Sequence, residues 1–419
     1  MGRKFTPDEK LILNLLKIYF SDLPEEEMRK KISILTEEAE QSKKTDWETV
    51  FCIGRKHGIT ALLYDAIRET AALDRTLEEK VSFDANATVL QNYRLLFLGR
   101  SVLELLEKKG IRAAILKGCC TGSFYPVPEL RKTGDLDILL LEKARLNEAC
   151  KLLEESGFIK EEVQQANHHV SYKTKKGIDV ELHILLTEPL DHEETNKIIE
   201  KIQAKCQDHI ILQETMGIEV SGLDEGYHSY YLLLHMLQHF LRAGFGLKLF
   251  CDWTAFWRKK HSEKEMETFL DLVKESGLLG FARVVTAACV AYLGLDGKKV
   301  SILFEGRRIS VNEAEKMSRD MMYDVVEAEE FGRSNNDRMV IMLDTGLPGY
   351  IREFHHQMRL NFPKTGKIVI LWPALWCVTL YRFLRNNRTV RKTSGLEILN
   401  TARKRSRLIK DMELFERKP

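Results

Sequence analysis

Two aspartates one residue apart, Asp135 and Asp137, open the apolar run in the segment RKTGDLDILLL. If that run forms a strand, both side chains point to the same face and both carboxylates converge on one point. Two negative charges held this close are costly unless a cation neutralises them. Mg²⁺ suits the role, because it takes oxygen ligands and keeps positions open for phosphates and water. The motif therefore predicts a magnesium site, and Gly134 allows close approach of a ligand; the plainer interpretation is an exposed acidic turn.

A second group of candidate residues could bind phosphates. The apolar run IRAAILKG lies between Gly110 and Gly118 and predicts a short buried strand. A glycine that leads into a helix can present backbone N–H groups to phosphate oxygens. Lys117 and Arg131 would add positive charge to a triphosphate site, and Ser123 is a weaker candidate contact. The alternative is an ordinary strand-to-helix turn with a solvated lysine.

A third carboxylate is predicted on a neighbouring strand, within GIDVELHILL. Asp179, Glu181 and His183 alternate along this run and so share a face. The opposite face is apolar and predicted to be buried: Val180, Leu182 and Ile184. A two-metal site requires such a carboxylate to hold a second metal or to accept the proton of an attacking hydroxyl, and the alternation alone leaves both Asp179 and Glu181 as candidates. A half-exposed edge strand with polar residues outward is the alternative.

Two pairs of histidines lie near these motifs in the sequence. His168 and His169 fall on the first arm of a predicted hairpin that turns at residues 176–177. Adjacent residues of a strand point to opposite faces, so at most one of the two rings should face the site. His235 and His239 lie four apart on a predicted helix, but the H-E-x-x-H zinc pattern is absent. We therefore expect this second pair to pack in the core or to line the nucleotide pocket.

The elements that would position these residues form a small α+β unit. Its order is strand, short helix or loop, strand, helix, hairpin, helix and a further strand-like segment, with helical patterns before and after it. A length of 419 residues exceeds what one compact core usually spans. The predicted regions are an N-terminal helical region (1–110), the α+β core (111–222), a helical domain that completes the pocket (223–300), and a mostly helical C-terminal region with a basic tail (301–419).

Composition indicates an ordinary globular protein, with 44% hydrophobic and 30% charged residues. The net charge of +2 gives no signal for nucleic-acid binding by the chain as a whole. The eight cysteines are scattered without a C-x-x-C pair, which predicts reduced thiols rather than a zinc site. The first ten residues show no secretory pattern and match the acylation pattern only formally, through Gly2 and Thr6. We expect a cytoplasmic protein.

The C-terminal quarter holds two features with alternative interpretations. The longest apolar run, residues 368–380, is too short to span a bilayer and predicts a core helix or an interfacial segment. Residues 382–410 are strongly basic. They predict either a solvated helix face or contact with nucleic acid, a lipid surface or a phosphorylated substrate. No transmembrane segment is predicted, and peripheral contact with a membrane is left open.

These motifs, in this order, resemble the nucleotidyltransferase superfamily with the DNA polymerase β-type catalytic fold. They are most similar to its uncharacterised bacterial nucleotidyltransferases. The resemblance extends over about residues 85–275 and rests on these segments: ILKG (115–118), YPVPELRKTGDLDILL (125–140), VELH (180–183), LLLHMLQHF (232–240) and LKLFCDW (247–253). It implies an α+β fold, in which a small mixed β-sheet with helices on one side is flanked by N-terminal and C-terminal helical regions.

The resemblance also implies residue roles and a reaction. Asp135 and Asp137 would bind two Mg²⁺ ions, with Glu181 as third carboxylate where many relatives have aspartate. The implied nucleotide-binding residues are Lys117, Gly118, Ser123, Arg131, Gly134 and His183. This sequence has Lys117-Gly118 where the superfamily often has Gly-Gly or Gly-Ser, and a longer gap before the aspartates. The implied reaction transfers a nucleotidyl group from an NTP, with ATP expected, to a hydroxyl of an unknown acceptor.

Two other functions compete with this interpretation. A glycosyltransferase could use the same D-x-D pair to hold a sugar nucleotide, but it would need parallel strands and helices before the motif. The first 110 residues are predicted to be helical, which disfavours that class. The second alternative is a non-catalytic nucleotide-binding module, which the three carboxylates disfavour.

Overall fold

The computed structural model describes most of the chain up to residue 328 and shorter stretches beyond it. The described residues are 4–161, 168–190, 192–242, 244–305, 311–328, 355, 358–359, 362, 365, 368–386 and 407–416. Gly2 of the acylation pattern and most of the basic segment 382–410 lie outside them.

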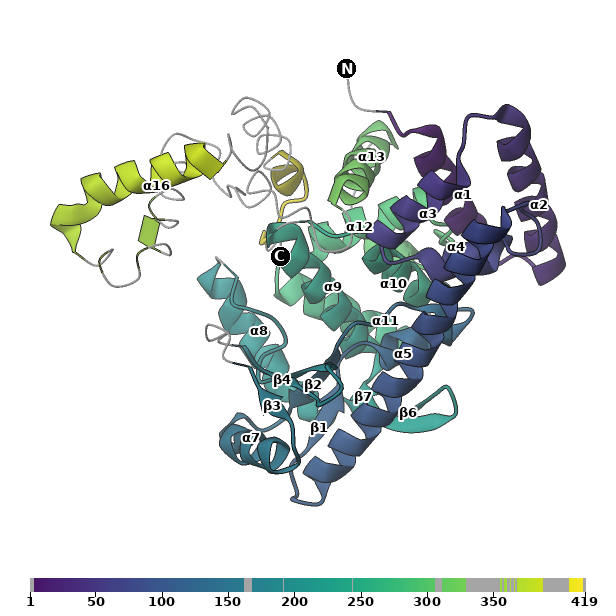
Figure 1. Cartoon of the computed structure of the whole chain (residues 1–419). Helices are drawn as coiled ribbons and strands as arrows, with labels where there is room; N and C mark the ends of the chain where they lie inside the picture. The colour runs from purple at the N-terminus through teal and green to yellow at the C-terminus, as the bar shows by residue number, and fades with distance from the viewer. Residues whose placement is uncertain are drawn as a thin grey trace.

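Five helices form the N-terminal part of the structure (Figure 1). Their bounds are α1 (Pro7–Tyr19), α2 (Glu25–Ser42), α3 (Trp47–Lys56), α4 (Thr60–Ile67) and α5 (Arg75–Glu107). Thr6 caps α1 through a reciprocal capping box with Glu9. Asp74 caps α5 by accepting hydrogen bonds from the backbone N–H groups of Thr76 and Leu77. The helical character predicted for this region is confirmed.

A seven-stranded mixed sheet follows, in the order β3-β4-β5-β2-β1-β7-β6. The strands are β1 (Ala113–Ile115), β2 (Leu136–Leu140), β3 (Ile159–Lys160), β4 (His169–Lys173), β5 (Asp179–His183), β6 (Ile210–Thr215) and β7 (Ile218–Leu223). β2 runs antiparallel to β1 and parallel to β5, and β4 pairs antiparallel with β5. The predicted α+β class, with a mixed sheet between helical regions, is confirmed.

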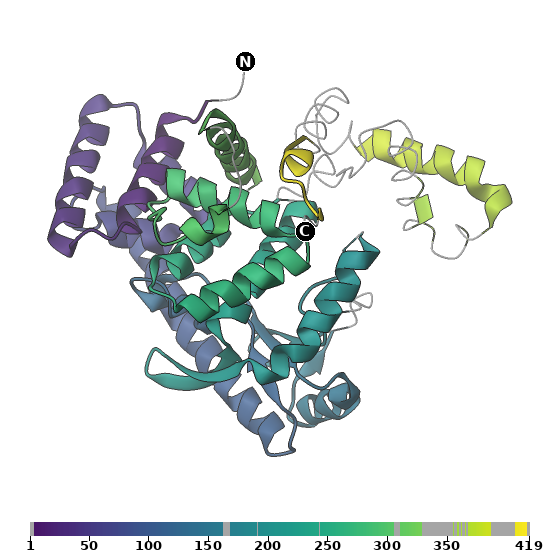
Figure 2. The ribbon, with the colours of Figure 1, turned by 180° about the vertical axis from the view of Figure 1, so that it is seen from behind.

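Further helices connect the strands and continue after the sheet. Those within the sheet region are α6 (Cys119–Gly122), α7 (Leu146–Glu155) and α8 (Glu193–Lys205). Those that follow are α9 (Glu225–Arg242), α10 (Leu247–Arg258), α11 (Glu263–Glu275), α12 (Leu279–Tyr292), α13 (Val311–Ala328) and α16 (Trp372–Asn386). Figure 2 shows α9 to α12 of this second helical group from behind, packed above the sheet. The division into four regions remains a prediction.

Helices cover both faces of the sheet, so the expectation of helices on one side is wrong. On one face, α5 and α7 bury Ile138 and Val180 in a core that also contains Leu96. On the other face, Leu139 joins the core formed by α9 and the remaining helices. The central strands are apolar on both faces at these positions, and each face therefore needs a cover. α5 approaches so closely that a Cβ at Gly99 would lie 2.8 Å from the Ile115 side chain.

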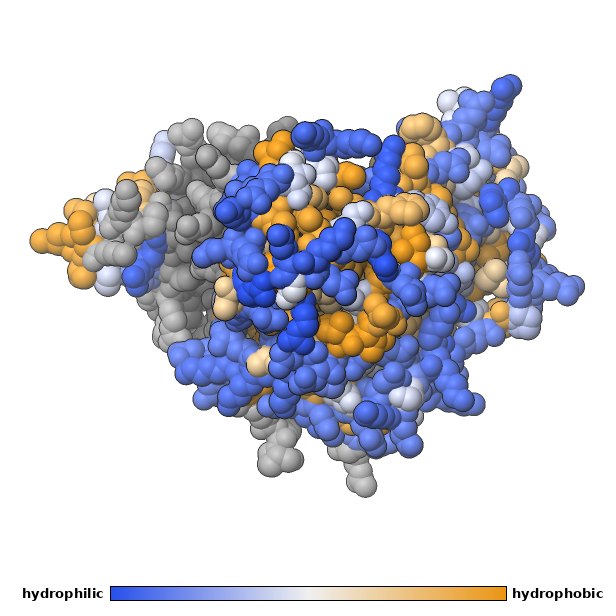
Figure 3. All heavy atoms as spheres, turned by 90° about the horizontal axis from the view of Figure 1, so that it is seen from below, coloured by the Kyte–Doolittle hydropathy of each residue, from blue (hydrophilic) through white to orange (hydrophobic). Residues whose placement is uncertain are grey.

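α16 projects away from the rest of the described structure (Figure 1). Several apolar side chains on and just before it are exposed, Ile370 by 86%, and Figure 3 shows apolar residues gathered at this end. The alternative of a core helix for residues 368–380 is therefore not what the structure shows. Among the helices in the described parts of the chain, none has the length and apolar character needed to cross a membrane.

Candidate active site

The register of two parallel strands brings the predicted carboxylates together. Asp137 on β2 pairs directly with Glu181 on β5, and Leu139 pairs with His183. Asp135 comes one residue before β2 and shares the face of Asp137. Asp137 is 1% exposed, whereas Glu181 is half-buried. Three carboxylates thus lie on one face of neighbouring strands, whereas Asp179 lies at the exposed start of β5 and pairs with Lys173 at 3.4 Å.

Lys117 lies against both aspartates of the motif. Its Nζ is 3.3 Å from Asp137 Oδ2 and 3.5 Å from Asp135 Oδ2. Burial lowers the pKa of Lys117, but the two carboxylates outweigh burial and raise it. The ammonium is therefore charged, and His235 Nε2, at 3.3 Å, accepts a hydrogen bond from it. His239 lies one helical turn further, with its Nε2 3.2 Å from His235 Nε2, so the expectation that this pair lines the site region agrees with its position.

His183 joins the two central carboxylates from the side opposite Lys117. Its Nε2 lies 3.1 Å from Asp137 Oδ1 and 3.1 Å from Glu181 Oε2. Burial lowers the pKa of His183, but hydrogen bonds to both carboxylates raise it to about 9. Burial raises the pKa of Asp137, but Lys117 and His183 lower it below its usual range. Burial likewise raises the pKa of Glu181, but His183 lowers it below its usual range. Both acids are therefore ionised at neutral pH.

Arg131 lies in a buried ion pair, and its contact with a triphosphate stays a prediction. It is 3% exposed, and its Nε and Nη2 donate to Asp252 Oδ1 and Oδ2 at 2.7 and 2.8 Å. Its Nη1 donates to Thr133 Oγ1 at 3.0 Å, and Tyr125 donates to the same Asp252 at 2.6 Å. The guanidinium is thus engaged in the protein. Its role is to fix the loop that ends at Asp135.

Ser123 and Gly134 also differ from expectation in their immediate roles. Ser123 donates its hydroxyl hydrogen bond to the Cys120 carbonyl at 2.7 Å, which ends the short helix α6. Gly134 is exposed, and an added Cβ there would meet no described atom within 4 Å. The fold itself therefore does not require a glycine at 134, and only a ligand would.

Gly118, by contrast, has a backbone conformation that favours glycine. Its φ is +71° and ψ is −116°, and an added Cβ would lie 3.3 Å from Thr133 Cγ2. We expect Gly118→Ala to lower the free energy of unfolding by about 1 to 3 kcal/mol, because residues with a Cβ rarely adopt this combination of φ and ψ. Gly134→Ala is the matched control and should have little effect. Urea unfolding compares the two, and equal losses would contradict the strain argument.

Both members of the His168-His169 pair lie beside His183, so the expectation that at most one faces the site is wrong. His169 is paired with His183 across β4 and β5, and their ring centroids are 5.1 Å apart. His168 precedes β4, so strand alternation does not apply to it. Its ring centroid is 4.2 Å from that of His169 and 5.9 Å from that of His183.

The buried His228 on α9 is expected to make the stability of the fold depend on pH. Burial, and secondarily Arg131, lowers the pKa of His228 from 6.5 to about 3. Between these values the unfolded chain binds a proton that the folded chain does not, so the free energy of unfolding falls as pH decreases from 6.5 towards 3. We expect His228→Gln to reduce this slope. Urea unfolding at several pH values between about 7 and 4 tests it, and an unchanged slope would contradict the assignment.

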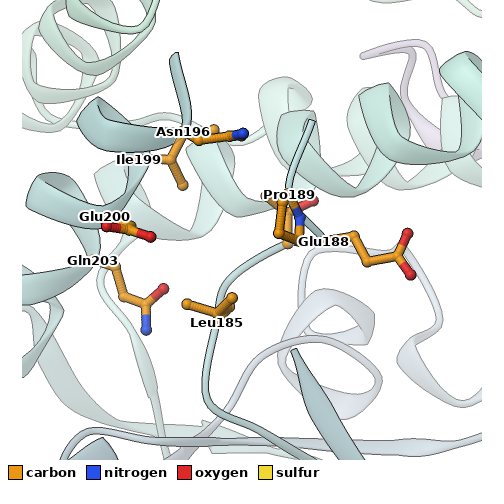
Figure 4. Close-up of a pocket in the computed structure, with 8 residues that line it drawn as sticks. Leu185, Glu188, Pro189, Asn196, Ile199, Glu200 and Gln203 are labelled. Atoms are coloured by element: carbon orange, nitrogen blue, oxygen red, sulfur yellow. The ribbon is translucent and has the colours of Figure 1, made fainter. Parts of the chain in front are cut away.

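A small pocket lies beside the segment that follows β5 (Figure 4). Two of its polar groups bind this segment to α8: Gln203 Nε2 donates to the Ile184 carbonyl at 2.6 Å, and Asn196 Nδ2 donates to the Leu190 carbonyl at 2.7 Å. Figure 4 shows Glu188 pointing away from the other lining side chains. The residues around the pocket therefore hold the segment after β5 against α8. Asp135, Asp137 and Glu181 do not line this pocket.

A family model described as uncharacterised nucleotidyltransferase matches residues 43–294. The chain belongs to this family. The matched segment of the chain includes every predicted site residue, from Lys117 to His183.

One solved structure with similarity to the chain is an antigenic nucleotidyltransferase-like protein from Paracoccidioides brasiliensis. The identity is 18%, over 43% of this chain and 88% of that one, with a TM-score of 0.28. No curated protein matches the sequence.

Proposed function

We propose that the chain is a metal-dependent nucleotidyltransferase that transfers an NMP from an NTP, with ATP expected, to a hydroxyl of a small-molecule or protein acceptor. The observation that supports this most strongly is the pairing of Asp137 with Glu181 on parallel strands, with Asp135 on the same face. Carboxylates gathered in this way are the ligands that a pair of divalent ions requires.

The residues present fit Mg²⁺. Asp137 Oδ2 is buried and accepts no hydrogen bond from the described part of the chain, although Lys117 lies 3.3 Å away. A buried carboxylate oxygen of this kind has capacity for a cation, and oxygen donors are those that Mg²⁺ prefers. Asp135, Asp137 and Glu181 would hold the metal. When bound, the metal would neutralise phosphate charge and promote ionisation of the acceptor hydroxyl.

The protein's own groups would orient the reactants. The acceptor oxygen forms a bond to the α-phosphorus, the bond from that phosphorus to the bridging oxygen breaks, and pyrophosphate leaves with the electron pair. Glu181 is ionised and could accept the hydroxyl proton. Lys117, charged and next to the turn at Gly118, would bind the triphosphate after leaving the aspartates.

Isothermal titration with a panel of NTPs and Mg²⁺ tests the proposal. Wild-type protein should bind at least one NTP in a metal-dependent way, and the Asp135→Asn, Asp137→Asn double variant should not. The matched control is Asp179→Asn, which removes a carboxylate on the neighbouring strand β5 that pairs with Lys173 outside the cluster. Failure of folded wild type to bind any NTP would contradict the proposal, and UDP-sugars would be titrated next. Cytoplasmic location stays a prediction.

A further inference from the structure

Three histidines form a compact cluster on the far side of Glu181 from Lys117. The strand order places β4 and β5 on one side of β2 and places β1, which leads to Lys117, on the other. His169 on β4 and His183 on β5 face each other, and His168 lies just before β4. One nitrogen from each of the three rings lies within 4.8 Å of the others.

The spacing of the rings matches that of imidazoles sharing one metal ion. With a metal–nitrogen distance of about 2.0 Å and tetrahedral angles, ring centroids lie about 5 Å apart. The observed separations of 4.2, 5.1 and 5.9 Å lie on both sides of this value. His169 Nδ1 is 2.8 Å from His168 Nε2, so only small movements are needed to direct both rings at one ion.

The surroundings of His168 match those of a metal ligand. The residue is 5% exposed, and its Nδ1 lies 3.7 Å from Glu188 Oε1, without a hydrogen bond from the described residues. A carboxylate behind one ring nitrogen directs the other nitrogen forward, the usual arrangement behind metal-binding histidines. Glu188 is itself paired with Arg242. Glu181 Oε1 lies 3.7 Å from His169 Nε2, the ring nitrogen that does not face His168.

We propose that His168, His169 and His183 bind a transition-metal ion such as Zn²⁺, next to the Mg²⁺ carboxylates that His183 contacts. Imidazole nitrogen selects zinc-like ions, whereas Mg²⁺ prefers oxygen. This inference rests on the proposed nucleotidyl transfer, in which Glu181 accepts the proton of the acceptor hydroxyl. An ion next to Glu181 would therefore lie near the acceptor. It would bind and orient an oxygen of the acceptor and would not contact the triphosphate.

The test is titration of the full chain with Co²⁺ as a spectroscopic substitute for Zn²⁺, in excess Mg²⁺ and without nucleotide. We expect one bound ion with the visible absorption of nitrogen-bound Co²⁺. His169→Gln should weaken binding at least 100-fold, and Glu188→Gln should weaken it about 10-fold, as loss of a supporting carboxylate does. His168→Ala repeats the test, with circular dichroism to verify the fold, because His168 is buried.

Two control variants separate the possible outcomes. The Asp135→Asn variant removes a carboxylate that pairs with Lys117 and should retain Co²⁺ binding, and this result does not depend on whether the protein binds NTP. His239→Gln removes a member of the competing pair, whose Nε2 atoms are 3.2 Å apart, and should also retain binding. No Co²⁺ binding by wild type, unchanged binding in His169→Gln, or loss of binding in either control would overturn the proposal.

Discussion

Glu181→Gln is expected to reduce the rate of nucleotidyl transfer about 10³-fold, within the range that a positioned proton acceptor contributes. Glutamine preserves the shape of the side chain but provides neither the negative charge nor a basic oxygen. Glu181 lies opposite Asp137 and within 3.1 Å of His183, so its charge belongs to the centre of the cluster. Pyrophosphate release from the preferred NTP measures the effect, with an acceptor found by screening hydroxyl compounds.

Affinity for the NTP should change far less than the rate, because Asp135, Asp137 and Lys117 remain in place. This difference separates Glu181 from the two aspartates, whose double replacement should abolish binding. Asp179→Asn, on the same strand but paired with Lys173 at 3.4 Å, should react at nearly the wild-type rate. If Asp179→Asn loses as much activity as Glu181→Gln, then the third carboxylate is misassigned.

The largest expected effect on stability comes from the buried pair of Arg131 and Asp252. Both side chains are almost fully buried, and two hydrogen bonds of 2.7 and 2.8 Å join them. Removing one partner leaves the other charge buried without compensation, which costs about 3 to 5 kcal/mol. We expect Asp252→Leu to lower the free energy of unfolding by about this amount, measured by urea unfolding.

The double variant Arg131→Met, Asp252→Leu is the critical comparison. It removes both charges and preserves apolar volume, so it should regain much of the stability that the single variant loses. Replacing the exposed pair Arg29 and Glu25 should have little effect by contrast. A double variant as unstable as Asp252→Leu would mean that the packing of Asp252, rather than its charge, determines the loss.

The elements and the carboxylates were predictable from the sequence because they depend on local periodicity. The alternation in DVELH indicated that Glu181 and His183 share a face, and the predicted hairpin turn includes Gly177, whose φ is +76°. The β6 to β7 hairpin was harder to see. Its turn at Met216 and Gly217 has positive φ at both residues but lacks the usual asparagine or aspartate before glycine.

Contacts between residues distant in the sequence could not be predicted in this way. Asp252 lies 121 residues beyond Arg131, and no local pattern indicated that the arginine would bind it instead of a phosphate. The orientation of His168 depended on where β4 begins. His168 lies just before the strand, and a residue there does not follow the alternation of side chains within it. The sequence also did not indicate that α5 covers one face of the sheet. Its helical pattern predicted only that it belongs to the N-terminal helical region.

The position of α5 limits how small a functional fragment can be. The helix is about 50 Å long and runs from the N-terminal helices along the sheet (Figures 1 and 2). Its Asn92 donates hydrogen bonds to the carbonyls of Glu129 and Arg131, in the loop that leads to Asp135. A fragment that begins at residue 111 would expose one apolar face of the sheet to water and release that loop. A fragment that keeps the candidate site intact must therefore include Asn92 and the part of α5 that packs on the sheet, well upstream of the first strand.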